Sequence, residues 1–152
     1  MRIAIGSDHG GWHLKEEMKE LIQELGHEVK DYGCETPDRC DYPDYAKQVA
    51  ISVAKGEFDR GILVCGTGIG MSIAANKIPG IRAAVCSDTF SARFSRLHND
   101  ANILCLGERV VGPGLAGDLV TVWLGAGFEG ERHAPRVQKI MDLERLPDEE
   151  TC

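Results

Sequence analysis

The chain has 152 residues, of which 43% are hydrophobic and 27% are charged, and its formal net charge is −7. This balance is typical of a globular domain rather than a disordered chain, and the acidic charge argues against nonspecific nucleic-acid binding as the main task. No run approaches the roughly 18 apolar residues that a membrane span requires, and the first residues do not have the long apolar segment of a signal peptide.

Segments typical of strands and of helices alternate along the chain. In chain order, the expected strands are Arg2–Ser7, Glu28–Tyr32, Gly61–Cys65, Ile81–Ser87 and Ala101–Gly107. The expected helices cover residues 12–25, 43–55, 68–77, 89–97, 113–124 and 132–146. Gly26 ends the first helix, as a C-terminal glycine does, and Pro43 suits the first turn of the second helix.

Apolar strands separated by helices indicate an α/β fold, in which a parallel sheet is covered by helices on both faces. Five strands favour a doubly wound sheet in the order 2-1-3-4-5. We expect a single domain over residues 1–146, followed by an acidic tail over residues 147–152. Sheets of this kind bind ligands beyond the carboxyl ends of their strands, where the strand order reverses.

The six cysteines do not have the pattern of a secreted disulfide framework. Cys65, Cys86 and Cys105 fall at or inside apolar runs, where a free cysteine behaves as a small hydrophobic residue. No CxxC pair occurs. We therefore expect a reduced, cytoplasmic protein, and the sequence leaves any redox role of the remaining three cysteines open: Cys34, Cys40 and Cys152.

The segment Gly61–Gly70 places Cys65 at the end of an apolar strand, just before a glycine-rich turn into a helix. A helix N-terminus exposes free N–H groups and the positive end of the helix dipole, and a thiol held there loses its proton more readily. The glycines let the backbone approach a bound anion closely. The segment therefore offers a thiolate beside an oxyanion site, although a cysteine at the end of a strand is more often buried filler.

Met71 excludes two familiar uses of such a glycine turn. The dinucleotide-binding fingerprint requires its third glycine at this position, and a phosphatase-like cysteine loop would need an arginine there, six residues after Cys65. No Gly-Lys-Ser/Thr follows, which excludes the P-loop as well. A hydrolase with Cys65 as nucleophile and His98 as its base, and a non-catalytic nucleotide-binding module, remain alternatives.

Polar residues also follow the first strand. Asp8 and His9 come directly after it, as Thr67 comes after Cys65. If the first and third strands are neighbours, all four side chains meet in one crevice, although an aspartate in this position is often only a helix N-cap. His9 and His13 are four residues apart, but no third ligand with suitable spacing is present, so we expect no metal.

Three arginines are candidates for binding an anion. Arg132 and Arg136 are four residues apart, a spacing that places both guanidinium groups on one face of the last expected helix. Two such groups suit a phosphate, although exposed arginines usually form ordinary surface pairs. Arg109, at the end of the fifth strand, is the third candidate. His98 follows the fourth helix, where a histidine also favours the helix dipole.

Seven short segments, in collinear order over residues 1–145, carry a resemblance to a known family. They are Gly6–Gly11, Asp41–Pro43, Cys65–Gly70, Ser72–Lys77, Gly80–Ala84, His98–Asp100 and Arg132–His133. Together they resemble type B ribose-5-phosphate isomerase, a family that also includes the galactose-6-phosphate isomerase subunits.

The resemblance implies a Rossmann-like three-layer sandwich that assembles as a homodimer, sometimes a tetramer, with the active site between subunits. It implies an aldose–ketose isomerase of carbohydrate metabolism that interconverts ribose 5-phosphate and ribulose 5-phosphate, as in the pentose phosphate pathway, without metal or organic cofactor. A six-carbon substrate, such as allose or galactose 6-phosphate, is the alternative within the family.

The resemblance also implies roles for individual residues. Cys65 would move a proton between C2 and C1 through an enediolate, and Thr67 would assist at the substrate oxygens. His98 would open the furanose ring, and Asp8 would bind or deprotonate a sugar hydroxyl. The enediolate oxygen would be stabilised by backbone N–H groups of Gly66, Gly68, Ile69 and Gly70. The phosphate would be held by His9, Arg109, Arg132 and Arg136, and the sugar would be lined by Tyr42 and Asn99.

Overall fold

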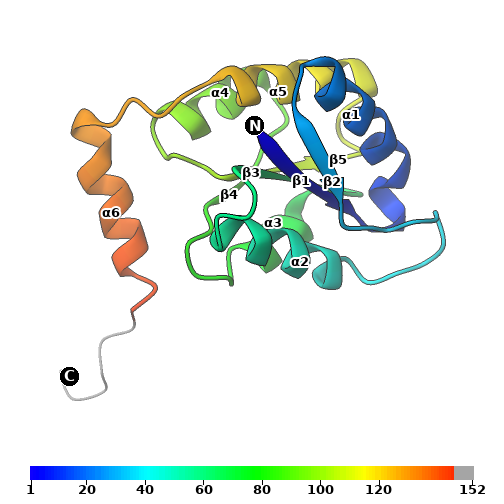
Figure 1. The fold of residues 1–152 in the computed structure, drawn as a ribbon, viewed down its shortest axis with the longest axis horizontal. Helices are drawn as coiled ribbons and strands as arrows, with labels where there is room; N and C mark the ends of the chain where they lie inside the picture. Colours follow the sequence, from blue (N-terminus) through cyan, green and yellow to red (C-terminus); the bar gives the residue numbers. More distant parts are fainter. Residues whose placement is uncertain (146–152) are drawn as a thin grey trace.

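Five parallel strands form one sheet, and helices cover both of its faces in the computed structural model, which describes residues 1–145 (Figure 1). The strands are β1 (Arg2–Ser7), β2 (Glu28–Asp31), β3 (Arg60–Cys65), β4 (Ala83–Val85) and β5 (Ile103–Gly107). The expected α/β class and parallel sheet are confirmed. The acidic tail expected at residues 147–152, Cys152 included, lies outside the described residues.

The helices follow the strands in alternation. They are α1 (Trp12–Glu24), α2 (Tyr42–Ala54), α3 (Ile69–Ala75), α4 (Thr89–Leu97), α5 (Pro113–Gly125) and α6 (Ala134–Asp142). Two short 3-10 turns, η1 (His9–Gly11) and η2 (Glu131–His133), precede α1 and α6. Most of these bounds lie within two residues of the expected ones, because prolines and glycines mark several helix ends.

The strand order is β2-β1-β3-β5-β4, so the expected order with β4 beside β3 was wrong. All five residues of β5 are buried, whereas β4 has three residues, none of them fully buried. A strand buried on both faces belongs inside a parallel sheet and a short, partly exposed one at its edge. Because β5 rather than β4 pairs with β3, the carboxyl end of β5 lies directly beside that of β3.

Two apolar clusters, one on each face of the sheet, form the core. On one face, Ile5, Ile62 and Leu104 pack with residues of α1 and α5, such as Met18 and Trp123. On the other face, the strands pack against α2 and α3. Figure 1 shows the sheet between these two helix layers, with α1, α4 and α5 on one side and α2 and α3 on the other.

The last helix differs from its expected range of 132–146. It divides into η2 and α6, because Pro135 has no N–H to continue a helix through it and suits the first turn of α6 instead. Arg132 therefore lies in η2 and Arg136 in α6, rather than together in one α-helix. Figure 1 shows α6 extending from the side of the molecule on a connecting segment.

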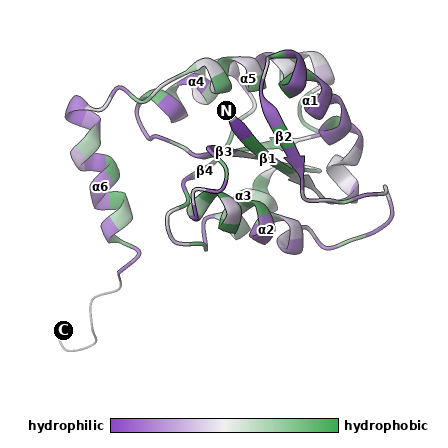
Figure 2. Ribbon diagram, viewed as in Figure 1, coloured by the Kyte–Doolittle hydropathy of each residue, from purple (hydrophilic) through white to green (hydrophobic). Residues whose placement is uncertain are grey.

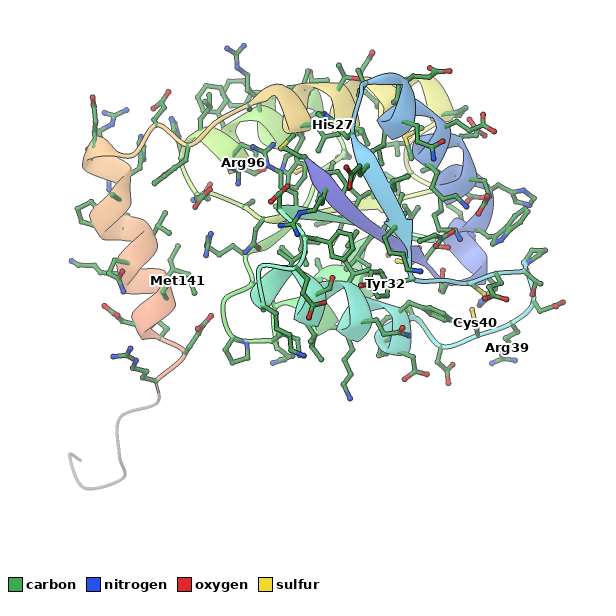
Figure 3. The ribbon with its side chains drawn as sticks, viewed as in Figure 1. His27, Tyr32, Arg39, Cys40, Arg96 and Met141 are labelled. Carbon is green, nitrogen blue, oxygen red and sulfur yellow. The ribbon has the colours of Figure 1, made fainter. Side chains whose placement is uncertain are left out.

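The helix α6 buries none of its residues, and Figure 2 shows both hydrophobic and hydrophilic residues along it. Ile140 is 44% exposed, and Leu143, just after the helix, is 76% exposed. Arg82 nevertheless reaches α6, where its guanidinium donates to Met141 Sδ at 3.1 Å; Figure 3 shows Met141 on this helix. Within residues 1–145, no helix combines the length and the hydropathy that crossing a membrane demands.

Candidate active site

Cys65 ends β3, and its side chain is 5% exposed. The Gly68 N–H donates to Cys65 Sγ at 3.1 Å, so the turn that follows the strand folds back over the sulfur. Gly68 has a φ of 79°, a left-handed conformation that glycine adopts without strain. A backbone N–H aimed at the sulfur fixes its position at the mouth of the turn.

The glycine turn packs so closely against its neighbours that side chains would not fit at several of its contacts. A Cβ on Gly107 would lie 2.6 Å from the Thr67 carbonyl carbon. A Cβ on Gly70 would lie 2.8 Å from the ring of Tyr42, which therefore lies directly over the turn. The hydroxyl of Thr67 accepts from the Ile69 N–H at 3.3 Å, and the side chain is exposed to solvent.

Asp8 and His9 lie beside this turn, because β1 and β3 are neighbours in the sheet. The Asp8 N–H donates to Val64 O at 3.3 Å. Asp8 Oδ1 accepts from the Gly10 N–H at 2.9 Å, which caps η1, and the residue is 8% exposed. His9 Nδ1 lies 3.3 Å from Cys40 N and 3.2 Å from Cys40 O, so the loop before α2 holds the imidazole.

The residues that follow β5 also lie beside the glycine turn. The Glu108 N–H donates to Cys65 O at 2.9 Å, and the Arg109 N–H donates to Gly66 O at 3.1 Å. The Arg109 guanidinium lies along the turn, 3.5 Å from where a Cβ of Gly66 would be. The observed strand order is the reason for this proximity, since β5 rather than β4 is the neighbour of β3. A cation therefore lies within reach of an anion bound at the turn.

Four of the expected site residues do not join this group within one chain: His98, Asn99, Arg132 and Arg136. The helix α4 starts beyond the carboxyl end of β4 and runs back. His98, at its end, therefore lies near the amino ends of the strands, whereas Cys65 lies at a carboxyl end. Two contacts locate that end of the sheet: Arg82, just before β4, donates to Asn99 O at 3.2 Å, and the Glu129 N–H donates to Leu97 O at 3.0 Å. Cys65 and His98 are thus at opposite ends of the same sheet.

His98 is held by aromatic rings on two sides. The ring of His133 stacks on it, with centroids 4.0 Å apart and planes 12° apart, and Phe94 meets it edge-on at 4.7 Å. Burial, together with the nearby positive charges of His98 and Arg132, lowers the pKa of His133 below its ordinary value. His133 is a stacking partner of His98 and an acceptor for the Arg132 guanidinium, whose Nε donates to Nε2 at 3.2 Å.

Among residues 1–145, one group of three potential metal ligands lies together: His98, Glu129 and His133, with ligand atoms within 4.8 Å of one another. The two imidazole planes are almost parallel, so their nitrogen lone pairs do not converge on one point. His133 Nε2 also already accepts from Arg132. The donor set therefore fits a hydrogen-bonded cluster better than a tetrahedral metal site.

Two residues in contact with the site were missed from the sequence. Glu108 Oε2 accepts from the Leu14 N–H at 2.9 Å and so ties the end of β5 to the first turn of α1. Its place directly after a strand was a signal that could have found it. Cys40 contacts His9 through its main chain, and no sequence pattern in the polar loop around Cys40 predicts this contact.

The chain is similar to known proteins over nearly its whole length. The signature of the family described as Ribose/Galactose Isomerase matches residues 3–140. Ribose-5-phosphate isomerase B of Escherichia coli is 55% identical, over 95% of this chain and 97% of that protein. D-erythrulose-4-phosphate isomerase of Pectobacterium atrosepticum is 47% identical, over 92% and 93%.

A solved structure shares the fold as well as the sequence. Ribose-5-phosphate isomerase B of Clostridium thermocellum superposes with a TM-score of 0.93 at 58% identity, covering 95% of this chain and 97% of the other. The resemblance carried by the seven short segments is confirmed. The chain belongs to the ribose/galactose isomerase family, and it is an isomerase.

Proposed function

We propose that the chain interconverts ribose 5-phosphate and ribulose 5-phosphate by proton transfer at Cys65. The observation that carries the proposal is the buried Cys65 sulfur under the Gly68 N–H, at the carboxyl edge of the sheet. Relatives named ribose-5-phosphate isomerase B support the choice of substrate. We place the reaction in the cytoplasm, where a catalytic thiol stays reduced.

The reaction needs a base and a stabiliser for the oxygen that becomes negative. The Cys65 thiolate takes the proton from C2 of the open-chain aldose, which leaves an enediolate, and then returns it to C1. Thr67 exchanges protons with the substrate oxygens. Backbone N–H groups of the turn, from Gly66 to Gly70, stabilise the enediolate oxygen, a contribution of about 3 kcal/mol per donor in comparable sites.

The phosphate keeps the sugar in register with the base. His9 and Arg109 lie beside the turn on this chain, and each supplies donors for the phosphate oxygens. Binding energy obtained at the phosphate then holds C1 and C2 against the sulfur, where proton transfer takes place. Asp8 binds or deprotonates a sugar hydroxyl, and Tyr42, over the turn, lines the sugar.

A second copy of the chain supplies the groups that one chain keeps apart. His98, which opens the furanose ring, lies at the far edge of its own sheet, and so do Asn99 and Arg132. The apolar residues Ile140 and Leu143 are left exposed at α6, as expected of an element that packs on another molecule. We therefore propose a homodimer whose active sites combine Cys65 of one chain with His98, Asn99, Arg132 and Arg136 of the other.

A complementation experiment tests the shared site. The variants Cys65→Ala and His98→Ala are each expected to have lost most turnover while still binding sugar phosphate. Refolded together, they form mixed dimers in which one of two sites carries neither change, so that about a quarter of the wild-type activity returns. The matched control mixes Cys65→Ala with Thr67→Ala, which stand on the same half of the site and should not rescue each other.

Two results would contradict this assignment. Full isomerase activity in Cys65→Ala would remove the base from the proposal. Absence of recovery in the Cys65→Ala and His98→Ala mixture, with mixed dimers verified by mass, would place both groups on one chain. Solvent deuterium entering at the substrate carbon supports proton transfer, whereas a trapped covalent intermediate would favour a hydrolase with Cys65 as nucleophile.

A six-carbon sugar phosphate is the second candidate, because the family description includes galactose and a 47% identical relative acts on a four-carbon phosphate by its name. Substrate length therefore varies among similar chains. Rates measured side by side on ribose 5-phosphate, allose 6-phosphate and galactose 6-phosphate decide between them, and a higher kcat/KM for a hexose phosphate would replace ribose 5-phosphate.

A further inference from the structure

The loop between β2 and α2 carries two thiols outside the candidate active site. Cys34 Sγ and Cys40 Sγ lie 2.8 Å apart. Cys34 is 4% exposed, whereas Cys40 is partly open to solvent, and Figure 3 shows Cys40 in this loop. Both thiols line a cavity of about 860 Å³, which Tyr45 and Gln48 of α2 also line. A small reagent in solution can therefore reach the pair.

The Cys34 end of the loop is firmly held. The fully buried Lys15 donates to Cys34 O at 2.9 Å and to Asp31 Oδ2 at 2.7 Å. The ring of Tyr45 packs on Gly33, where a Cβ would lie 2.5 Å from it. Residues 35–39, between the two cysteines, are all exposed. A change at the sulfurs is therefore taken up mainly at the Cys40 end.

Both cysteines contact the segment that ends β1. The Cys34 N–H donates to Ser7 O at 2.9 Å, and the Ser7 N–H donates to Gly33 O at 2.8 Å. Cys40 contacts His9 Nδ1 through its main-chain N and O. A bond between the sulfurs would thus link the residue that is bonded to Ser7 with the residue that contacts His9.

We propose that Cys34 and Cys40 form a redox-active thiol pair, which a hydroperoxide or a low-molecular-weight disulfide oxidises to an intramolecular disulfide that displaces His9. With hydrogen peroxide, two thiols and one peroxide give one disulfide and two waters: the sulfurs lose two electrons, and the peroxide oxygens gain them. Cys40, the more exposed thiol, attacks a peroxide oxygen, which releases the first water and leaves a sulfenic acid; Cys34 then attacks the Cys40 sulfur and releases the second water. Disulfide sulfurs lie about 2.05 Å apart, so the pair closes by less than about 1 Å.

Peptide mapping tests the bond itself. Trypsin cleaves after Lys30, Arg39 and Lys47, so Cys34 and Cys40 fall in separate peptides, 31–39 and 40–47, unless a disulfide joins them. Native protein treated with oxidised glutathione, then alkylated and digested, should yield the joined peptide. Dithiothreitol should remove it, and Cys34→Ser and Cys40→Ser should each prevent it. Absence of the joined peptide from the folded protein, or its appearance only after unfolding, would overturn the proposal.

Kinetics test the effect on His9, a part that rests on the proposed function. Loss of one charge-assisted contact to phosphate should raise KM for ribose 5-phosphate about tenfold, with kcat within about twofold. Dithiothreitol should restore KM, and the oxidant should leave KM of Cys34→Ser unchanged. An unchanged KM in fully joined protein would overturn the link to His9, and inactivation shared with Cys34→Ser would assign the effect to Cys65.

The two measurements separate failure of this proposal from failure of the isomerase. The joined peptide is observed whether or not the protein turns over a sugar phosphate. Reduced protein that converts no sugar phosphate would refute the proposed function while leaving the disulfide standing. Protein that is active when reduced but yields no joined peptide after oxidation would refute the disulfide while leaving the proposed function standing.

Discussion

Gly107 shows how one hydrogen atom in place of a side chain positions the candidate active site. A Cβ there would lie 2.6 to 2.7 Å from backbone atoms of Thr67, and neither backbone can move without moving the other. We expect Gly107→Ala to lower kcat/KM about a hundredfold, because a shift of about 1 Å at reacting groups costs this much. Steady-state kinetics on the folded variant provide the measurement.

The matched control is Gly114→Ala in the first turn of α5, where a Cβ would meet no atom within 4 Å. Alanine is the better helix former by up to about 1 kcal/mol, so this variant should keep its activity and be at least as stable as the wild type. Equal kinetics in Gly107→Ala and Gly114→Ala would show that the contact with Thr67 does not position the turn.

At the residue scale, the sequence was sufficient for side chains that directly follow a strand. Asp8, His9 and Cys65 could be brought together because parallel strands end at one edge. Arg109 could be named, but its place beside Gly66 depends on the order of β4 and β5. The contact of Cys40 with His9 depends on loop geometry, which leaves no periodic trace in the sequence.

At the scale of elements, Lys15 connects α1 to β2 and to the loop after it. Its ammonium group is fully buried and bonds to Asp31, Glu16 and Cys34 O. Lys15→Met leaves Asp31 partly buried with one cation fewer, and we expect it to cost about 3 kcal/mol of unfolding free energy. Lys19→Met is the control: Lys19 also pairs with Asp31 but is a quarter exposed, and it should cost about 1 kcal/mol or less.

Urea titration of both variants measures the difference. A loss of similar size in the two would mean that burial of the Lys15 ammonium group has no special part in joining α1 to β2.

The ion pair between Lys15 and Asp31 also predicts how the free energy of unfolding depends on pH. Burial alone would raise the pKa of Asp31, but hydrogen bonds from Lys15, Lys19 and the Gly33 N–H outweigh it and hold the pKa below its ordinary value of 3.8. The carboxylate therefore stabilises the fold at any pH above that value, and this contribution is lost as the pH falls through the lowered pKa. Asp31→Asn should flatten the pH dependence of unfolding below about pH 4. Parallel slopes in variant and wild type, from urea titrations at several pH values, would contradict it.

Among the elements, those with a clear apolar period and capping residues could be predicted closely, as α1 and α4 were. β4 was expected over Ile81–Ser87 but has three residues, because an edge strand is paired on one side only. The expected last helix was divided at Pro135, whose effect on a helix depends on which turn it occupies.

At the scale of the whole molecule, the exposed apolar residues of α6 belong with the proposed dimer. Ile140 and Leu143 are 44% and 76% exposed, so the double variant Ile140→Asp and Leu143→Asp should leave the fold of one chain intact. The same charges would destabilise an apolar contact between two chains. We expect the double variant to dissociate at concentrations at least about a hundredfold higher than the wild type. Activity should return as the protein concentration rises, and analytical ultracentrifugation follows the assembly.

Leu25→Asp provides the control, since Leu25 is a comparably exposed apolar residue, 38%, at the end of α1. It should leave assembly unchanged. A double variant at Ile140 and Leu143 that assembles and reacts like the wild type would remove α6 from the proposed interface.

The global architecture was more predictable than its arrangement in detail. Alternating apolar strands and helices are sufficient for a parallel sheet with two helix layers, and seven short segments were sufficient for the family. The order of the last two strands was predicted wrongly, although β5 (ILCLG) is longer and more apolar than β4 (AAV), as an interior strand is. The separation of Cys65 from His98 follows from α4, which starts beyond the carboxyl end of β4 and runs back along the sheet.

Arg60, the first residue of β3, has a consequence for how this protein could be redesigned. Its guanidinium donates to the carbonyl oxygens of Trp123, Leu124 and Ala126 at 2.8 to 2.9 Å, which fastens the end of α5 to the central strand. The connection to α6 therefore starts from a fixed point, and the length of residues 127–130 acts as a spacer between the folded body and α6. Adding glycine and serine there would lengthen the reach of α6 in steps while leaving the sheet and Cys65 of the same chain in place, and it would also shift Arg132 and Arg136 relative to the partner's half of the proposed site.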